Sequence, residues 1–396
     1  MDVTKYRRER IFQPISTGEL ERRWQEVRKM MTDKGIDCLV MQNNSQFLGG
    51  YVRWFTDVPA VNGYPLTVIF PLEGEMTIVS SGGPPIPAYP PEWAVRGAKV
   101  VPASYFLTFN YTKFLDAEII AKTLKVNEAK VVGLLGENFI PASLYNYLRK
   151  NLPAVELIEA ADFVDEIKAI KSEEEISLIR KCAAIQDIGM AAIPELLKPG
   201  MREFELRSAL EHMMMDLGSE EKWIMIGSAP AGQLSNQKHP FLQNRVIEKG
   251  DQVCVMNEVN GPGGFYTEVG RTYILGKPTT ELKNIWQEAV EAQKLTASLL
   301  KPGAKPADIF DANNQFLMDR GYPPEGRLYC HGQGYDLVER PAIRTDETML
   351  IKENMNIAVH PRIVTQTAHA YCCDNYLTTA NGSIRIHETP LELFVV

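Results

Sequence analysis

The apolar segments of this 396-residue chain change their rhythm near residue 168. Before this point, short apolar runs such as CLVM and TVIF alternate with turn-forming or amphipathic segments, which is typical of an α/β domain. Directly after it, the pattern predicts a long helix, because Ser172 and Glu175 have the spacing of a capping box. We therefore place a domain boundary just before this helix.

The second part of the chain mixes predicted helices with antiparallel strands. Helices are expected at 202–218 and 280–300, and strands at 223–230 and around 251–275. A chain of this length also exceeds one typical hydrophobic core. We therefore predict two domains, an α/β domain over residues 1–167 and an α+β domain over residues 168–396.

The composition limits the possible partners. The formal net charge is −8, whereas nucleic acids and anionic membranes require a basic surface, so we expect a small molecule instead. The first twelve residues lack the apolar core of a signal peptide, and no run of about 18 apolar residues occurs. We therefore expect a cytoplasmic protein. The six cysteines show no CxxC spacing and are predicted to be free thiols.

Every histidine of the chain lies after residue 211, so histidine chemistry would belong to the second domain. Three of them stand in suggestive surroundings: His239 in QKHPF, His331 in CHGQGYD and His360 in AVHPRI. The glycines after His331 permit tight turns that present an imidazole into a cleft. We expect the other three to be ordinary surface or core residues: His212, His369 and His387.

Asn257 and Glu268 stand eleven positions apart in the predicted strand pair DQVCVMNEVNGPGGFYTEVGRT. Two carboxylates at this spacing would hold two metals, whereas one amide and one carboxylate would hold a single metal or none. Asp374, in AYCCDNYLTT, belongs to a further predicted strand. The residue types at these positions are those of a metal site.

Together with KSEEEISLIR and YTEVGRT, these segments resemble the pita-bread family, which includes creatinase, aminopeptidase P, prolidase and methionine aminopeptidase. The likeness covers nearly the whole chain, since GIDCLVMQNNSQFLGGY is similar to the N-terminal domain of the creatinase and aminopeptidase P branch. The resemblance implies an α/β N-terminal domain followed by an α+β pita-bread catalytic domain. It also implies a homodimer, in which the N-terminal domain of one chain closes the active site of the other.

In the metallopeptidases of this family, two aspartates, one histidine and two glutamates hold a pair of divalent metals. The resemblance assigns these roles to Asn257, Glu268, His331, His360 and Asp374, so four of the five ligands differ from the family pattern. The ligand particular to one metal has become the neutral Asn257. The other four positions keep coordinating atoms, which implies one divalent transition metal (zinc, iron, manganese or nickel) held by Glu268, His331, His360 and Asp374.

The resemblance also places His239 at the family's substrate-side histidine, and Glu339 and Glu258 are candidate general bases. Other side chains carry the charge or aromatic surface that would bind a substrate with a carboxylate or a cationic group. These are Arg53, Trp54, Tyr64 and Arg340, and the neutral amide of Asn257 is a further substrate-binding candidate. For Trp54 the alternative is a core aromatic. By strand alternation, Cys372 shares the face of Asp374 and is either a pocket-lining residue or a buried filler.

We predict a single-metal hydrolase that cleaves a C–N bond of a small non-peptide or modified amino-acid substrate. One alternative is a metal-dependent lyase that catalyses β-elimination, as a dimethylsulfoniopropionate lyase of this fold does. A second is a metal-free creatinase-like hydrolase centred on His239, although Gly270 and His360 stand where creatinase is expected to have glutamates. A third is a non-catalytic binding protein.

Overall fold

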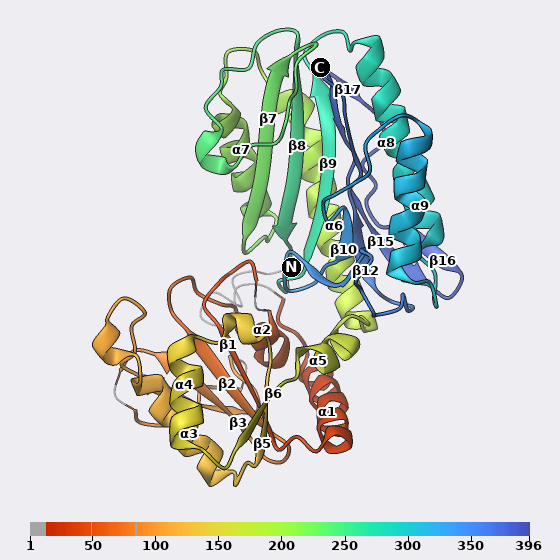
Figure 1. The fold of residues 1–396 in the computed structure, drawn as a ribbon. Helices are drawn as coiled ribbons and strands as arrows, with labels where there is room; N and C mark the ends of the chain where they lie inside the picture. Colours follow the sequence, from red (N-terminus) through yellow and green to blue (C-terminus); the bar gives the residue numbers. More distant parts are fainter. Residues whose placement is uncertain (1–12, 49, 84, 93) are drawn as a thin grey trace. The chain divides into compact units, whose positions relative to one another are not determined.

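The computed structural model describes residues 13–48, 50–83, 85–92 and 94–396 (Figure 1). The opening segment used above to argue against a signal peptide lies outside these residues. The chain forms two compact units, with the division between Lys168 and Ala169. Among the described helices, none is both long enough and apolar enough to cross a membrane.

The first unit is built on a mixed six-stranded sheet with the order β4-β3-β2-β1-β5-β6. Its β1-β2 and β2-β3 pairs are antiparallel, and the other pairs are parallel. The strands are β1 (Cys38–Asn43), β2 (Leu66–Pro71), β3 (Met76–Ser81), β4 (Ala98–Ala103), β5 (Val131–Leu134) and β6 (Glu156–Glu159). The helices are α1 (Thr17–Lys34), α2 (Tyr51–Thr56), α3 (Leu115–Val126), α4 (Ala142–Asn151) and α5 (Ala161–Lys168), with short 3-10 turns η2 (Asn110–Thr112) and η3 (Glu137–Phe139).

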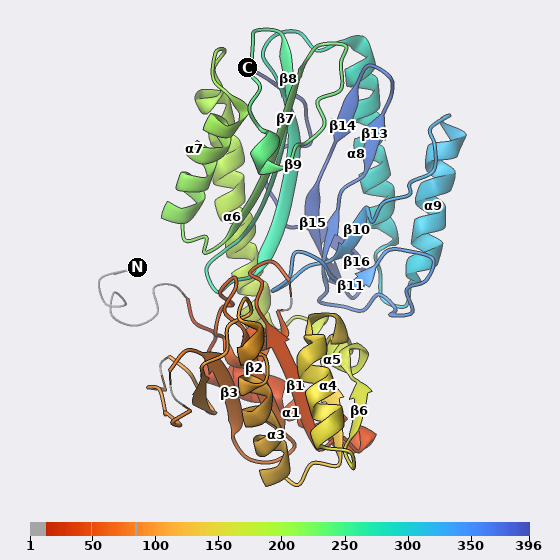
Figure 2. The ribbon, with the colours of Figure 1, turned by 60° about the vertical axis from the view of Figure 1, so that its left-hand side comes forward.

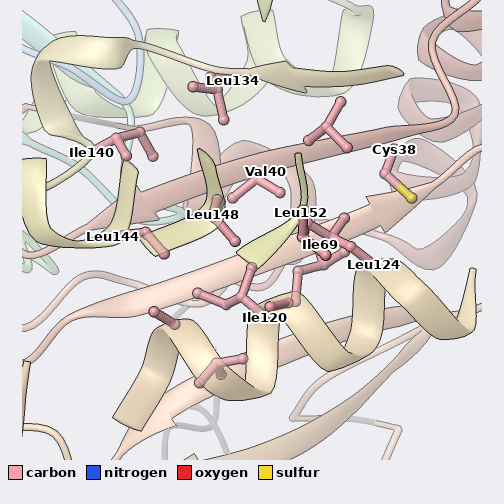
Figure 3. Close-up of a cluster of buried hydrophobic side chains, with 14 of the residues drawn as sticks. Cys38, Val40, Ile69, Ile120, Leu124, Leu134, Ile140, Leu144, Leu148 and Leu152 are labelled. Carbon is pink, nitrogen blue, oxygen red and sulfur yellow. The ribbon is translucent and has the colours of Figure 1, made fainter. Parts of the chain in front are cut away.

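Local sequence explains the passage from helix α1 into strand β1. The Ser16 side chain caps the first turn by accepting a hydrogen bond from the amide of Glu19. Gly35 ends the helix in the left-handed conformation, at φ 67°, which a glycine adopts without steric cost. Figure 3 shows the core that follows, where α3 and α4 pack on β1 through residues such as Val40, Ile120 and Leu148.

The second unit begins with α6 (Glu173–Leu196), and the predicted capping box is present. The Ser172 hydroxyl accepts from the amide of Glu175, whose carboxylate accepts from the amide of Ser172. The other helices of this unit are α7 (Glu203–Asp216), α8 (Thr280–Leu299) and α9 (Pro306–Asp319), with the 3-10 turn η4 (Pro240–Leu242).

Two larger sheets and a two-stranded ribbon form the interior of the second unit. The first sheet, in the order β17-β9-β8-β7, contains β7 (Lys222–Pro230), β8 (Asp251–Asn260), β9 (Tyr266–Ile274) and β17 (Phe394–Val395). The second, in the order β11-β10-β12-β15-β16, contains β10 (Cys330–Gly332), β11 (Glu339–Ala342), β12 (Asn356–Val359), β15 (Asp374–Thr379) and β16 (Gly382–Arg385). The ribbon pairs β13 (Arg362–Val364) with β14 (His369–Tyr371).

The helices of this unit cover the sheets from two sides (Figures 1 and 2). Helices α6 and α7 pack on one face of β7-β9 through a core that includes Met190, Leu206 and Val255. Helices α8 and α9 lie on the other side, where Ile285 and Leu317 share a core with the β13-β14 ribbon. On the face of β8 and β9 turned away from α6 and α7, Met256 packs with Tyr371 and Cys373, and the candidate site lies there.

Candidate metal centre

Three predicted ligands come together in the second unit. One ligand atom from each of Glu268, His331 and His360 lies within 4.8 Å of the other two, and all three residues are buried. Glu268 stands on β9, His331 on β10, and His360 immediately follows β12. Three strands from separate parts of the sequence therefore supply a single cluster.

Strand pairing explains why the two histidines meet. Strands β10 and β12 are antiparallel, with His331 opposite Ala358. His360, two residues after Ala358, therefore points to the same face of the sheet as His331 and is its diagonal neighbour. The amide of His360 donates to the carbonyl of Tyr329 at 2.9 Å, which extends the pairing past the end of the strand. The two imidazole centroids are consequently 5.1 Å apart, with the rings inclined by 66°.

Both imidazoles are prepared to act as ligands. Nδ1 of His331 lies 2.9 Å from the carbonyl oxygen of Gly332. Because a carbonyl only accepts, Nδ1 must carry the proton and Nε2 keeps a free lone pair. The ring nitrogens of His360 are buried and make no hydrogen bond with the described residues. Burial lowers the pKa of His360 to about 4, so its imidazole is neutral at neutral pH. A buried, neutral, unbonded imidazole beside a carboxylate fits a metal ion.

Glu268 supplies the carboxylate of the cluster. Its Oε1 lies 3.7 Å from Nε2 of His360. Burial acts to raise the pKa of Glu268, but the two histidines and a thiol hydrogen bond outweigh it and hold the pKa below its ordinary value. The backbone amide of Glu268 donates to Oδ1 of Asn375 at 2.7 Å, which ties β9 to β15.

Glu258 joins the cluster from the neighbouring strand. It lies directly opposite Glu268 in the antiparallel β8-β9 pair, so both carboxylates share one face of the sheet. Gln333 donates a hydrogen bond to Oε1 of Glu258 at 2.8 Å. Burial and the adjacent Glu268 raise the pKa of Glu258 well above its ordinary value. Of the two carboxyl groups, Glu258 is therefore the one whose ionisation is disfavoured.

Asn257 points to the opposite face of the sheet. Its Nδ2 lies 3.5 Å from the sulfur of Met214 on α7. A Cβ placed on Gly189 of α6 would also lie 3.5 Å from Nδ2 of Asn257. Asn257 is fully buried there. The structure thus brings Glu258, and not the predicted Asn257, to the cluster.

The adjacent residues Cys373 and Asp374 also point to opposite faces, as Glu258 and Asn257 do. The Cys373 thiol donates to Oε1 of Glu268 at 2.7 Å. The Asp374 carboxylate faces away from the cluster, where it accepts from Arg271 at 2.8 Å, from Gln293 at 3.0 Å and from Arg385 at 3.2 Å. The fourth predicted ligand therefore lies outside the three-residue group. Sequence reasoning passed over Cys373, although the alternation of side chains along the strand offered the signal.

The remaining cysteine of this pair and Gly270 complete the local packing. Cys372 is buried in the core shared with α8 and is the filler of the two alternatives considered. A Cβ on Gly270 would lie 2.4 Å from the Tyr371 ring, closer than side-chain carbons approach. The structure has no room for the glutamate that the metal-free creatinase pattern requires at this position.

The two predicted catalytic residues have structural partners. Glu339 forms a buried ion pair with Lys171 at 2.9 Å and accepts from the amide of Tyr335. The ring of His239 packs against Trp223, with centroids 5.4 Å apart. Trp223 lies across the strands from Glu258, so His239 is connected to the candidate site through one aromatic side chain.

The predicted substrate-binding residues are dispersed. Arg340 forms an ion pair with Glu347 through both carboxylate oxygens. Trp54 is buried in the first unit and packs edge-on against Phe55, with centroids 5.2 Å apart, as a core aromatic would. Arg53 is buried on α2, whereas Tyr64 is exposed.

A search for related proteins agrees with this architecture. The sequence profile of Metallopeptidase family M24 matches residues 177–391. The chain is 27% identical to an Xaa-Pro dipeptidase of Pyrococcus furiosus over 339 residues, which cover 84% of this chain and 92% of the dipeptidase. It is 25% identical to a creatinase of a Bacillus species over 228 residues, 54% of either chain.

The fold is also found in solved structures. An X-Pro aminopeptidase from Thermotoga maritima superposes with a TM-score of 0.79, covering 94% of this chain and 99% of the aminopeptidase, at 18% sequence identity. An α/β N-terminal unit followed by an α+β pita-bread unit defines the class, and the predicted fold is thereby confirmed. Since the family profile matches more than half of the sequence, the chain belongs to Metallopeptidase family M24.

Proposed function

We propose that this chain is a single-metal hydrolase that cleaves a C–N bond of a small substrate, and not a two-metal peptidase. The observation that carries the proposal is the cluster of Glu268, His331 and His360 with a neutral imidazole that no described residue satisfies. A divalent metal bound there supplies a Lewis acid that polarises the bond under attack and acidifies water.

The orientation of Asn257 and the hydrogen bonding of Glu258 support a single metal ion at this site. Asn257 faces α7 and cannot reach the cluster without leaving its strand register. Glu258 is in reach, but Gln333 binds one of its oxygens and the adjacent Glu268 disfavours a second negative charge. The chain therefore offers one set of ligands and, next to it, a proton-holding carboxylic acid.

Glu258 has the position of a proton carrier for C–N cleavage. Departure of an amine requires a proton on the leaving nitrogen, and a buried carboxylic acid beside the site can donate it. Asn375 donates to the side-chain oxygens of Gln333 and Asn356 at 2.9 and 3.0 Å, and Asn356 donates to the backbone carbonyl of Gln333 at 3.1 Å. Through Gln333 this network holds the Glu258 carboxyl, and through Asn375 it holds the backbone amide of Glu268.

The substrate class follows from relatives that act on small molecules, since an Xaa-Pro dipeptidase and a creatinase both match this chain. We propose a small amide, amidine or lactam that carries a carboxylate or a cationic group. A homodimer and a cytoplasmic location remain predictions that follow from the family resemblance and the sequence.

The proposal is tested by metal analysis joined to a substrate panel. The full-length protein is expected to bind about one equivalent of transition metal, and to hydrolyse a member of a panel of N-acyl amino acids, guanidino acids and lactams. His331→Ala and His360→Ala should lose both properties. His212→Ala is the matched control, because its imidazole is 80% exposed on α7. Hydrolysis in ¹⁸O-water should place one labelled oxygen in the product.

Other outcomes would refute parts of the proposal. Two equivalents of metal would mean that Glu258 is a ligand of a second ion. Turnover that survives complete removal of metal would favour the creatinase-like reaction. Product without labelled oxygen would indicate elimination, and no turnover or ligand-induced stabilisation with any panel member would leave a binding protein.

A further inference from the structure

We infer that Cys373 is the fourth ligand of this metal centre and binds the ion as a thiolate. The inference rests on the single-metal site proposed above and assigns it a ligand that changes its metal preference. The resemblance assigns the last ligand of the site to the carboxylate of Asp374, but the side chain that contacts Glu268 is the thiol of the preceding residue, Cys373.

The position of the sulfur is the first argument. Sγ of Cys373 lies 2.7 Å from Oε1 of Glu268, and Nε2 of His360 lies 3.7 Å from the same oxygen. A nitrogen and a sulfur thus approach one carboxylate oxygen. Since Asp374 is held by Arg271 and Gln293 on the other side of the strand, Cys373 is the residue of this strand that faces the cluster.

The backbone holds Cys373 at this position. Cys373 and Gly270 exchange two backbone hydrogen bonds, of 3.1 and 3.2 Å, so Cys373 is fixed against β9 two residues from Glu268. Arg271 donates a third hydrogen bond to the carbonyl of Cys373 at 2.8 Å. Because Gly270 has no side chain, Tyr371 closes over this junction, where a Cβ would otherwise collide with its ring. The sulfur is therefore presented by a constrained segment.

An independent observation points to a ligand at the same place. The imidazole of His360 is nine-tenths buried, faces Glu268, and makes no hydrogen bond through either nitrogen with the described residues. A buried imidazole without partners loses several kcal/mol of hydration unless something else binds it. A metal ion held by His360, His331 and Glu268, whose ligand atoms lie within 4.8 Å of one another, would satisfy the ring. The Cys373 sulfur lies outside that three-residue group but contacts Glu268, so it would turn onto the ion in place of the proton that the thiol shares with Glu268.

The chemistry of this set selects among metals. On binding, the metal–sulfur bond forms as the S–H bond breaks, and the proton leaves to solvent. The carboxylate and the thiolate then balance the charge of a divalent ion. A thiolate with two imidazoles favours zinc, cobalt(II) or iron(II), whereas manganese and magnesium prefer oxygen ligands. We therefore expect zinc and cobalt to outcompete manganese.

Cobalt(II) gives a direct test, because a thiolate ligand produces a charge-transfer band in the near ultraviolet that oxygen and nitrogen ligands do not. The full-length protein is dialysed against a chelator, loaded with cobalt(II) chloride and measured by absorption. We expect the band in the parent protein and its loss in Cys373→Ser. The matched control is Cys372→Ser, one residue away in the core facing α8, which should keep the band.

Zinc titration extends the same test. Loss of a second-layer hydrogen bond commonly costs about 10- to 100-fold in metal affinity, so loss of the ligand in Cys373→Ser should cost at least this much. Thermal unfolding confirms that both variants are folded. Visible cobalt bands without the charge-transfer band in the parent protein would refute the thiolate ligand and leave the single-metal site intact. Failure to bind cobalt or zinc at all would overturn both proposals.

Discussion

At the scale of single residues, two pairs of sequence neighbours have one member that faces the metal cluster and one that faces away from it. Glu258 and Cys373 face the cluster, while Asn257 and Asp374 face away. Because side chains alternate along a strand, a displacement of one residue moves the side chain to the other face of the sheet. The family resemblance assigned roles to Asn257 and Asp374, and the pairing of strands decides which neighbour reaches the site.

Asp374 gives a prediction at this scale. Its carboxylate and the Arg271 guanidinium form an ion pair in which both side chains are fully buried. Removing one partner of such a pair costs roughly 3–5 kcal/mol, since the other charge remains buried. Asp374→Asn should therefore lower the free energy of unfolding by this amount, measured by urea denaturation, while the folded protein still binds one zinc ion.

The exposed pair of Arg344 and Asp346 provides the control for this measurement. Asp346→Asn should leave the free energy of unfolding nearly unchanged, because exposed ion pairs contribute little. If Asp374→Asn kept its stability but lost zinc, Asp374 would instead be the ligand that the family resemblance implies.

At the scale of elements, helix α3 contains a buried acid that makes the first unit sensitive to pH. Asp116 stands in the first turn of α3, where its oxygens accept from the amide of Ala117 at 2.7 Å and from Gln42 at 3.4 Å. Burial raises the pKa of Asp116 from its ordinary 3.8 to about 6. The folded unit therefore binds this proton more tightly than the unfolded chain does.

The sign of the effect follows from the raised pKa. Stability from the protonated carboxyl is fully present below pH 3.8 and is lost as the pH rises through about 6. Asp116→Asn should be the more stable protein at pH 8, by up to about 3 kcal/mol, and this advantage should shrink as the pH falls toward 4. Thermal unfolding at a series of pH values measures it.

Glu118, an exposed acid in the first turn of the same helix, is the control for this experiment. Glu118→Gln should show no comparable gain on raising the pH. A constant difference between Asp116→Asn and the parent protein from pH 4 to pH 8 would contradict the assigned titration.

At the scale of the whole molecule, all the candidate ligands belong to the second unit. A metal that binds only the folded site stabilises the protein around it, by about 2.7 kcal/mol when its concentration is 100 times the dissociation constant. Zinc should therefore slow amide hydrogen exchange in peptides from β9, β10 and β12. Peptides from the first unit serve as the internal control and should exchange unchanged.

The same exchange measurement on His331→Ala separates site binding from unspecific effects. The variant should show no zinc-dependent protection in β9, β10 or β12. Protection of the first unit to the same degree as the second would instead show that the two units respond to metal together.

Much of the fold was predictable because its signals are local. The helix starts at Ser16 and Ser172, the stop at Gly35 and the strand runs of the first unit are all encoded within a few residues. The metal cluster was predictable in part. Glu268, His331 and His360 stand in family-like segments, and the structure places them together.

By itself, the sequence determined the two-part architecture, the family and three of the residues that form the cluster, because short-range patterning and motif order carry that information. Only the tertiary structure decided that Glu258 and Cys373 face the site and that Asp374 stabilises Arg271 instead. The sequence of a strand does not specify which of its two faces is turned toward the site, because side chains alternate between the faces. Long-range pairing, here between Gly270 and Cys373, selects the face that meets the site.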